Sequence, residues 1–282
     1  MRLLCHVLLL VMLAGCRPVE ILDAFTPGTG YRLQSDLAYG ALPRQRLDVY
    51  SPTAPVSDPP PVIVFFYGGS WHSGEKADYR FVAQRLAQKG YVVVIPDYRL
   101  YPAVKFPAFL EDGALALKWM QDHVEDYGGD ADRTFLLGHS AGAYNAVMLG
   151  LDTRLTARAG FDRRRLKGVI GLAGPYDFKP NTDLLQDVFG SARDPAETQP
   201  VTYANTKAPP MLLIIGEDDT TVEPRNSESL ARHLRENGNP VRLRRYPDED
   251  HIDLVLELSS FMNSSSPVLD DILDFLSDPK GE

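Results

Sequence analysis

Short apolar runs alternate along the chain with longer segments in which apolar residues recur at helical spacing. Most of the runs carry no charge and are rich in Val, Ile and Leu, as expected of strands buried on both faces of a sheet. Because strands alternate with helices, the pattern predicts an α/β fold with a mostly parallel sheet covered on both faces. The predicted strands are residues 46–50, 62–66, 91–95, 134–137, 169–172, 211–215 and 241–246, and the predicted helices are 77–89, 107–124, 141–149, 225–237 and 267–277.

The N-terminal segment has a different composition from the rest of the chain. Arg2 is its only charged residue, and residues 3–14 form an apolar run broken only by His6. Such a run is too short to span a bilayer and is typical of a secretory signal. It ends in the sequence LAGC at residues 13–16, which resembles the lipobox of bacterial lipoproteins, in which the cysteine is lipidated and becomes the mature N-terminus.

This segment divides the chain into three predicted parts. We expect a lipoprotein signal peptide at residues 1–15, a tether at 16–30 that begins with a lipidated Cys16, and one folded domain at 31–282. The predicted location is the bacterial cell envelope, lipid-anchored and facing the periplasm. A plain signal peptide cut nearby and an uncleaved anchor are the alternatives. Removal of Cys5 and acylation of Cys16 would leave the domain without a thiol, and hence without a disulfide or cysteine metal site.

Length and charge narrow the classes of function. The 282 residues are enough for one large α/β domain, and no low-complexity linker divides them. The formal net charge is −9 and the pI is about 5.2, whereas a nucleic-acid surface needs a clustered basic patch. The basic residues at 163–167 precede a predicted strand and are interpreted as a solvated turn. We therefore expect no nucleic-acid partner.

A candidate nucleophile lies in the sequence GHSAG at residues 138–142, between a predicted strand and a predicted helix. A turn this tight forces the serine into a strained backbone conformation, and a side chain at Gly138 or Gly142 would collide with its neighbours. The hydroxyl of Ser140 then stands clear of the sheet at the positive end of the following helix. The side chain of His139 is expected to point away from this chemistry.

A serine nucleophile needs a base that removes its proton and a carboxylate that orients the base. Loops at the carboxyl ends of parallel strands are where such groups converge. Downstream of Ser140, His233 falls within a predicted surface helix, whereas His251 follows the last strand in a polar loop. His251 is therefore the candidate base. The candidate acids follow two earlier strands: Glu217, Asp218, Asp219 and, as a lesser alternative, Asp177.

Acyl transfer also requires backbone N–H groups aimed at the oxygen on which charge develops. The sequence YGGSW at residues 67–71 directly follows a predicted strand, and its glycines allow the chain to approach a substrate closely. The aromatic residues at its two ends, Tyr67 and Trp71, are candidate substrate contacts. The candidate donors of the oxyanion hole are the N–H groups of Gly69, Ser70 and Ala141.

Taken together, these motifs resemble those of the α/β-hydrolases, most closely the bacterial carboxylesterases and hormone-sensitive-lipase-like enzymes. The resemblance implies an α/β-hydrolase fold with a mostly parallel central sheet, helices on both faces and a small lid insertion. It covers about residues 40–277 and rests on YGGSW at 67–71, PDYRL at 96–100, GHSAG at 138–142, GEDDTTV at 216–222 and His251.

The resemblance also implies roles for individual residues. Ser140 would be the nucleophile, His251 the base and then the acid, and Asp219 the carboxylate that holds the imidazole tautomer. The family's acid lies three residues after the glycine that ends a strand and three before an apolar residue, a position that Asp219 occupies and Asp218 does not. Tyr67 departs from the family, in which a histidine usually opens the glycine motif.

Two further features are interpreted as structural or auxiliary. Asp97 and Arg99 are expected to pair and to fix a loop. The insertion at residues 176–206 is long enough to cover the site. Apolar residues recur there at helical spacing and predict a short amphipathic lid segment, namely Leu184, Leu185, Val188 and Phe189.

The expected function is hydrolysis of small acyl or aromatic carboxylic esters through a Ser-His-Asp triad and an acyl-enzyme. No metal or organic cofactor is needed, because the nucleophile and the acid–base group both belong to the protein. An amidase, formamidase or peptidase is the alternative enzyme, and a non-catalytic surface binding protein is the alternative from another class. The expected partners are a small-molecule ester and a membrane, reached through the lipid anchor.

Overall fold

A computed structural model describes residues 26–54, 58–205, 207–260 and 266–280. The predicted signal peptide, the predicted lipidation site at Cys16 and most of the predicted tether lie outside these residues. No helix within the described ranges is long and apolar enough to cross a membrane.

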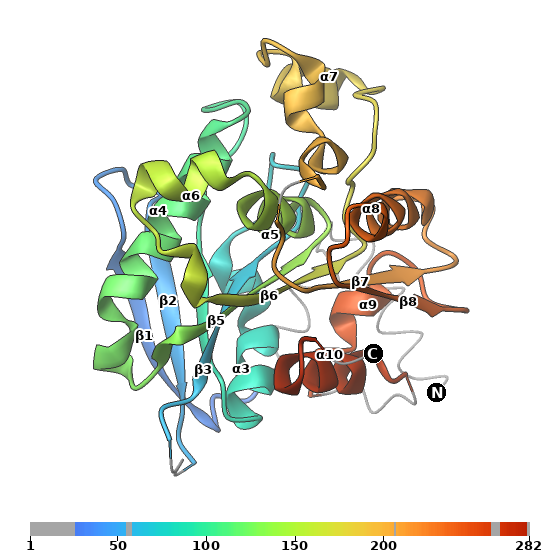
Figure 1. Cartoon of the computed structure of the whole chain (residues 1–282). Coiled ribbons are helices and arrows are strands. Elements are labelled where there is room, and N and C mark those ends of the chain that lie inside the picture. Colours follow the sequence, from blue (N-terminus) through green and yellow to red (C-terminus); the bar gives the residue numbers. More distant parts are fainter. Residues whose placement is uncertain (1–25, 55–57, 206, 261–265, 281–282) are drawn as a thin grey trace, which may run out of the picture.

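An eight-stranded sheet runs through the described part of the chain in the order β1-β2-β4-β3-β5-β6-β7-β8 (Figure 1). The strands from β4 to β8 in this order pair in parallel, whereas β1 and β2 pair antiparallel to their neighbours. The mostly parallel sheet is therefore as predicted. The bounds are β1 (Tyr31–Ala38), β2 (Arg46–Pro52), β3 (Pro61–Phe66), β4 (Val92–Pro96), β5 (Asp130–His139), β6 (Leu166–Leu172), β7 (Met211–Gly216) and β8 (Val241–Tyr246).

The central strands owe their positions to apolar side chains on both faces. Every residue of β4 and β7 is buried, and so is β3 after its first residue. A strand of this composition is stable only where helices cover both of its faces, which places it in the interior of a parallel sheet. Each predicted strand corresponds to an observed one.

Helices cover both faces of the sheet (Figure 1). α3 and α10 lie on one face, and α4, α5 and α8 lie on the other. In α8 the buried residues Leu230, Ala231 and Leu234 recur at helical spacing, so one stripe of the helix packs on the sheet while the rest faces water. The helices are α3 (Arg80–Gln88), α4 (Ala108–His123), α5 (Ala141–Leu151), α6 (Thr153–Ala159), α7 (Asp183–Phe189), α8 (Arg225–Glu236), α9 (Asp253–Leu256) and α10 (Val268–Ser277), with 3₁₀ turns η2 (Lys76–Tyr79), η3 (Val124–Tyr127), η4 (Arg163–Arg165), η5 (Pro195–Thr198) and η6 (Pro200–Tyr203).

β1 has no counterpart among the predicted strands. It is an edge strand whose side chains are mostly exposed, so its sequence lacks the apolar run that marks the buried strands. Its antiparallel ladder with β2 is interrupted between Gln34 and Leu37. Lys76 Nζ ties this edge to β2, because it lies 2.8 Å from both Asp36 and Asp48.

Candidate active site

Ser140 lies in a sharp turn between β5 and α5. β5 ends at His139, Ser140 has a φ of 56°, and α5 begins at Ala141. The Ser140 N–H donates to the Leu172 carbonyl at 2.9 Å, and the Ser140 carbonyl accepts a hydrogen bond from the Tyr144 N–H at 3.1 Å. The chain therefore changes from strand to helix at this one residue.

Both flanking glycines are required by close backbone contacts, as predicted. A Cβ on Gly138 would lie 2.2 Å from the carbonyl oxygen of Gly142, and a Cβ on Gly142 would lie 2.0 Å from that of Phe66. Neither distance is compatible with a side chain, so only glycine fits at these positions. The close packing in turn holds the serine at a φ that residues other than glycine rarely adopt.

Three side chains from separate loops meet at the carboxyl end of the sheet. His251 Nε2 lies 2.9 Å from Ser140 Oγ, and His251 Nδ1 lies 2.8 Å from Asp219 Oδ2. Because a carboxylate only accepts, Nδ1 carries the hydrogen and Nε2 presents its lone pair to the hydroxyl. Asp219 is 4% exposed, and its Oδ1 accepts the N–H groups of Thr221 and Val222 at 2.9 and 2.8 Å. Hydroxyl, imidazole and carboxylate are thus linked in series.

The other candidates have different partners or face solvent. Asp218 is exposed, and Glu217 pairs with Arg245 at 2.8 Å. The Asp177 carboxylate accepts a hydrogen bond from the Ser229 hydroxyl at 2.6 Å. His233 lies on α8 as predicted, with Nδ1 2.8 Å from the carbonyl oxygen of Ser229 in the same helix. Of the acids considered, it is Asp219 that lies against His251.

The loop after β3 approaches the nucleophile closely. A Cβ on Gly68 would lie 3.1 Å from Ser140 Cβ. Gly69, Ser70 and Trp71 follow with φ values of 117°, 53° and 57°. Within the described residues, the N–H groups of Gly69 and Ser70 donate to no protein acceptor. Ala141 is the first residue of α5, where helical N–H groups have no partner within the helix.

Tyr67 braces this loop from inside the protein, so its expected role as a substrate contact is wrong. The side chain is fully buried; its hydroxyl donates to Asp97 Oδ1 at 2.7 Å and accepts from Arg44 Nη2 at 3.0 Å. Arg44 also donates to the carbonyls of Tyr98 and Gly74. Burial raises the pKa of the Asp97 carboxyl, and the hydrogen bonds it accepts oppose that rise. The tyrosine thus braces the loop at the position where a histidine usually opens the family's glycine motif.

Asp97 and Arg99 do not form the predicted pair, although both fix loops. Asp97 accepts from Tyr67 and, at 2.8 Å, from the backbone N–H of Lys76. Arg99 forms a bidentate pair with the buried Asp112 of α4, with Nε–Oδ2 and Nη2–Oδ1 distances of 2.8 Å. The planar guanidinium of Arg99 binds both carboxylate oxygens of Asp112 at once. Asp97 does not offer this geometry, because it already accepts hydrogen bonds from Tyr67 and Lys76.

The insertion at residues 176–206 contains a short amphipathic helix, α7, as predicted. Its buried residues are Val188 and Phe189, and in Figure 1 it stands beyond α5. The Phe189 ring centroid lies 4.8 Å from that of Trp71, which is 2% exposed beneath it. The Trp71 indole N–H donates to Asn145 Oδ1 at 3.0 Å. Trp71 is therefore part of a packed aromatic layer under α7, and its expected contact with substrate stays a prediction.

His139 contacts the loop that carries His251, so the expectation that it points away from the site is wrong. Its Nε2 lies 2.8 Å from the backbone oxygen of His251, and the two ring centroids are 4.9 Å apart. Because a carbonyl only accepts, Nε2 carries the hydrogen. Burial, with a smaller contribution from His251, lowers the pKa of His139 to about 3. The alternation of side chains along β5 predicts the direction of the His139 side chain. It does not predict that the loop carrying His251, which is distant in the sequence, lies against it.

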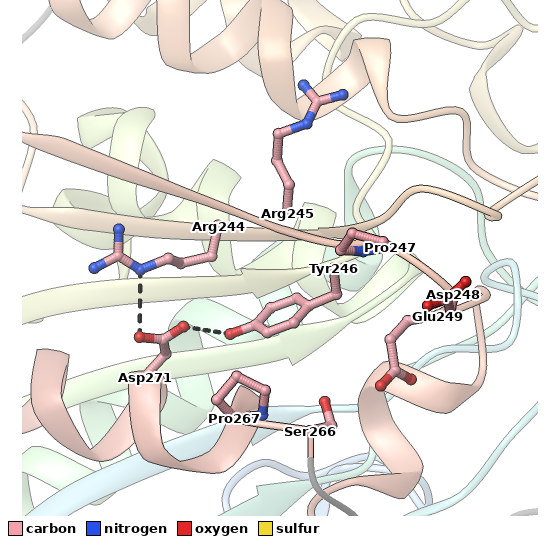
Figure 2. A pocket seen from close by; sticks show the side chains of 9 residues that line it. All are labelled: Arg244, Arg245, Tyr246, Pro247, Asp248, Glu249, Ser266, Pro267 and Asp271. Atoms are coloured by element: carbon pink, nitrogen blue, oxygen red, sulfur yellow. Dashed lines mark hydrogen bonds and ion pairs between the residues drawn. The ribbon is translucent and has the colours of Figure 1, made fainter.

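Elsewhere the structure offers an open cavity of about 550 Å³ beside β8 and α10. Figure 2 shows Arg244 and Tyr246 directed at Asp271 in its lining. Arg244 Nε lies 3.3 Å from Asp271 Oδ1, and the Tyr246 hydroxyl donates to Oδ2. The residues around Ser140 are not part of this lining. No group of three His, Cys, Asp or Glu side chains in the described ranges could hold a metal ion.

The strand order and the turn at Ser140 define an α/β-hydrolase fold, which solved structures share. Esterase B from Lactobacillus rhamnosis has a TM-score of 0.81 at 19% identity, covering 93% of this chain and 90% of that one. A hyperthermophilic esterase from the archaeon Pyrobaculum calidifontis has a TM-score of 0.74 at 22% identity, covering 93% and 89%. At these identities the likeness establishes the fold.

The chain belongs to the BD-FAE family, whose model matches residues 47–234. A probable isoprenylcysteine alpha-carbonyl methylesterase from Oryza sativa subsp. japonica is 30% identical over 240 residues, which are 78% of this chain and 58% of the relative. Esterase LipC from Mycobacterium tuberculosis is 30% identical over 217 residues, 70% of this chain and 54% of the relative. The chain thus spans little more than half the length of these relatives. The family match includes Ser140 and Asp219, and His251 lies beyond it.

Proposed function

We propose that the protein is a serine hydrolase that cleaves carboxylic esters of small acyl or aromatic substrates. The observation that carries the proposal is the linked series of Ser140, His251 and Asp219, with distances of 2.9 and 2.8 Å. The names of the relatives support ester hydrolysis, because they describe an esterase and a methylesterase.

The proposed reaction begins with attack of Ser140 Oγ on the ester carbonyl carbon, while His251 Nε2 takes the serine proton. The resulting imidazolium keeps its Nδ1–H bonded to Asp219, whose negative charge stabilises it. The carbonyl oxygen becomes an oxyanion and accepts the N–H groups of Gly69, Ser70 and Ala141. The positive end of α5 lies beside the same oxygen and adds to its stabilisation.

The second half of the cycle releases the products. The tetrahedral intermediate collapses, the bond to the alcohol oxygen breaks, and His251 donates its proton to the departing alcohol. Water then attacks the acyl-enzyme with His251 as base, and the acid leaves as Ser140 regains its proton. Each oxyanion donor is expected to contribute about a hundredfold to a thousandfold in rate.

The packing around α7 supports a compact substrate. Phe189 packs this helix against Trp71 and its aromatic neighbours, and Val188 is also buried. A long acyl chain would have to displace them and expose apolar surface to water. An amide would pass through the same tetrahedral intermediate as an ester. The packing of α7 limits the size of the substrate and does not distinguish esters from amides, so a panel of substrates must distinguish them.

A fluorophosphonate probe with p-nitrophenyl acetate tests the nucleophile. The probe should modify Ser140, and Ser140→Ala should abolish both labelling and hydrolysis. Ser277→Ala, near the end of α10, is the control, because its hydroxyl bonds within its own helix; it should keep both activities. A folded wild-type protein that is neither labelled nor active would contradict the proposal.

The assignment of the acid has its own matched pair of variants. Asp219→Asn should lower kcat by about 10⁴-fold, because an amide in place of the carboxylate favours the wrong imidazole tautomer. Asp218→Asn changes the exposed neighbour and should leave kcat close to wild type. A panel of short p-nitrophenyl esters and N-formyl aryl amides then separates the reactions: faster turnover of the amides would replace the esterase by an amidase.

We also propose that the chain is a lipoprotein attached through Cys16 to a bacterial envelope membrane and facing the periplasm. The sequence LAGC at residues 13–16, directly after an apolar run, supports this. In cells that express the full-length chain, a palmitate analogue should label the processed protein, and Cys16→Ser should abolish the label. Cys5→Ser is the control, since residue 5 would leave with the signal peptide. A label that persists in Cys16→Ser would overturn this anchor.

A further inference from the structure

The backbone at Trp71 gives the loop after β3 its shape. Ser70 and Trp71 have φ values of 53° and 57°. Residues with side chains rarely adopt this conformation, and it persists only where the surroundings hold it. The Trp71 carbonyl accepts the Tyr101 N–H at 2.8 Å, which fixes the backbone on one side. The contacts of the Trp71 indole ring fix this backbone on the opposite side.

The indole is bound to the helix that follows the nucleophile. Its Nε1–H donates to Asn145 Oδ1 on α5 at 3.0 Å. Because Trp71 is 2% exposed and Asn145 is 1% exposed, this hydrogen bond is shielded from water. The rings of Tyr144 and Phe189 confine the indole, with centroids 5.1 and 4.8 Å away. One directional contact therefore couples the loop to the helix that begins at the nucleophile.

Packing alone does not explain an asparagine at position 145. Its Nδ2 is buried and has no partner within the described residues. Since a buried donor without an acceptor destabilises the fold, apolar residues of similar shape at both positions 71 and 145 would pack at lower cost than this pair. The amide is better accounted for by what Oδ1 does for Trp71 than by stability, in line with the way functional sites trade stability for geometry.

We propose that Asn145 is a positioning residue for the oxyanion hole. By holding the Trp71 indole, it maintains the left-handed backbone at Ser70 and Trp71, and with it the direction of the Gly69 and Ser70 N–H groups. Asn145 acts through Trp71 and contacts no reacting atom. The inference rests on the proposed function, because these N–H groups have an oxyanion to bind only if Ser140 attacks a carbonyl.

Four variants test the role: Asn145→Leu, Trp71→Phe, the double variant, and Asn145→Asp. The first two each remove one partner and should lower kcat for p-nitrophenyl acetate by roughly tenfold to a hundredfold with little change in KM, because displaced donors weaken binding of the transition state more than that of the substrate. The double variant should be no slower than either single one, since both remove the same interaction. Asn145→Asp retains an acceptor and should keep kcat within a few-fold of wild type.

The melting temperature separates positioning from a merely structural role. Each single replacement leaves a buried polar group unpaired and should lower Tm, whereas the double variant removes both groups and should recover much of that loss. Asn145→Asp should be less stable because it buries a charge. A positioning role predicts that kcat stays low in the double variant despite its recovered Tm, and that the rate of fluorophosphonate labelling falls in parallel.

Two results would overturn the inference. One is an unchanged kcat in folded Asn145→Leu, and the other is recovery of kcat together with Tm in the double variant. Failure of the proposed function looks different, because wild-type protein would then neither hydrolyse the ester nor react with the probe. The two outcomes are therefore distinguishable within the same set of measurements.

Discussion

The turn after β5 and the loop after β3 follow neighbouring strands and lie close together at Ser140. Both contain residues with positive φ, yet different contacts hold them. The turn after β5 is fixed by main-chain packing, because a Cβ on Gly138 or Gly142 would meet backbone atoms at 2.2 and 2.0 Å. The loop after β3 depends on side chains as well as main-chain contacts, because the Tyr67 hydroxyl binds Asp97 and the Trp71 indole binds Asn145. The first is a steric lock between backbone atoms, and the second includes hydrogen bonds between side chains far apart in the sequence.

The difference determines how each loop responds to substitution. A steric lock has no flexible part, so an added methyl group must displace the backbone itself. A loop held by hydrogen bonds can lose one partner and keep its remaining contacts, so damage is graded. The turn at Ser140 should therefore fail completely when altered, whereas the loop at 67–71 should lose rate in steps.

Gly142→Ala should have the largest effect of these changes. The new Cβ would lie 2.0 Å from the carbonyl oxygen of Phe66, and neither backbone can move without distorting β3 or α5. We expect the free energy of unfolding to fall by about 3 kcal/mol and ester hydrolysis to drop by more than about a hundredfold. Urea unfolding and initial rates measure both. Gly28→Ala is the control, because no atom lies within 4 Å of its Cβ position; equal stability of the two variants would contradict the steric lock.

Tyr67→Phe should have a smaller and graded effect. It leaves the Asp97 carboxylate without its 2.7 Å donor from Tyr67 and removes one of the acceptors of Arg44. We expect a loss of about 2 kcal/mol in the free energy of unfolding and of about tenfold in kcat, because the adjoining glycines lose part of their support.

Tyr39→Phe provides the matched control for Tyr67→Phe. The Tyr39 hydroxyl donates to the Asp97 carbonyl and is likewise buried, but among the described residues it forms no hydrogen bond with the loop at residues 67–71. It should lose comparable stability while kcat is retained. An equal loss of kcat in both variants would show that rate follows general stability and not support of this loop.

The same contrast explains what the sequence could predict. The buried strands and the GHSAG turn were predictable because the residues that mark them in the sequence are adjacent: an apolar run fills both faces of a strand, and two glycines flank one serine. His251 was predicted to be the base from its position after the last strand, and Asp219 was predicted to be the acid from the resemblance to a family. The bracing contacts of Tyr67 and Asn145 join segments far apart in the chain, and no spacing encodes such pairs. β1 was missed because an exposed edge strand carries no apolar run.

The smallest expected effect is the pH dependence of stability that His139, next to Ser140 in the turn after β5, should produce. Its pKa is lowered to about 3, from 6.5 in the unfolded chain, chiefly by burial. Between these values the unfolded chain binds a proton that the folded protein excludes, so stability falls as pH decreases below 6.5 and the residue contributes no such loss above it. The expected cost at pH 5.5 is about 1.3 kcal/mol relative to pH 7. Urea unfolding of wild type and His139→Gln at both pH values should show a smaller acid loss in the variant. Equal losses in the two proteins would mean that folding does not lower the pKa of His139, and that the turn is more open to water than its packing indicates.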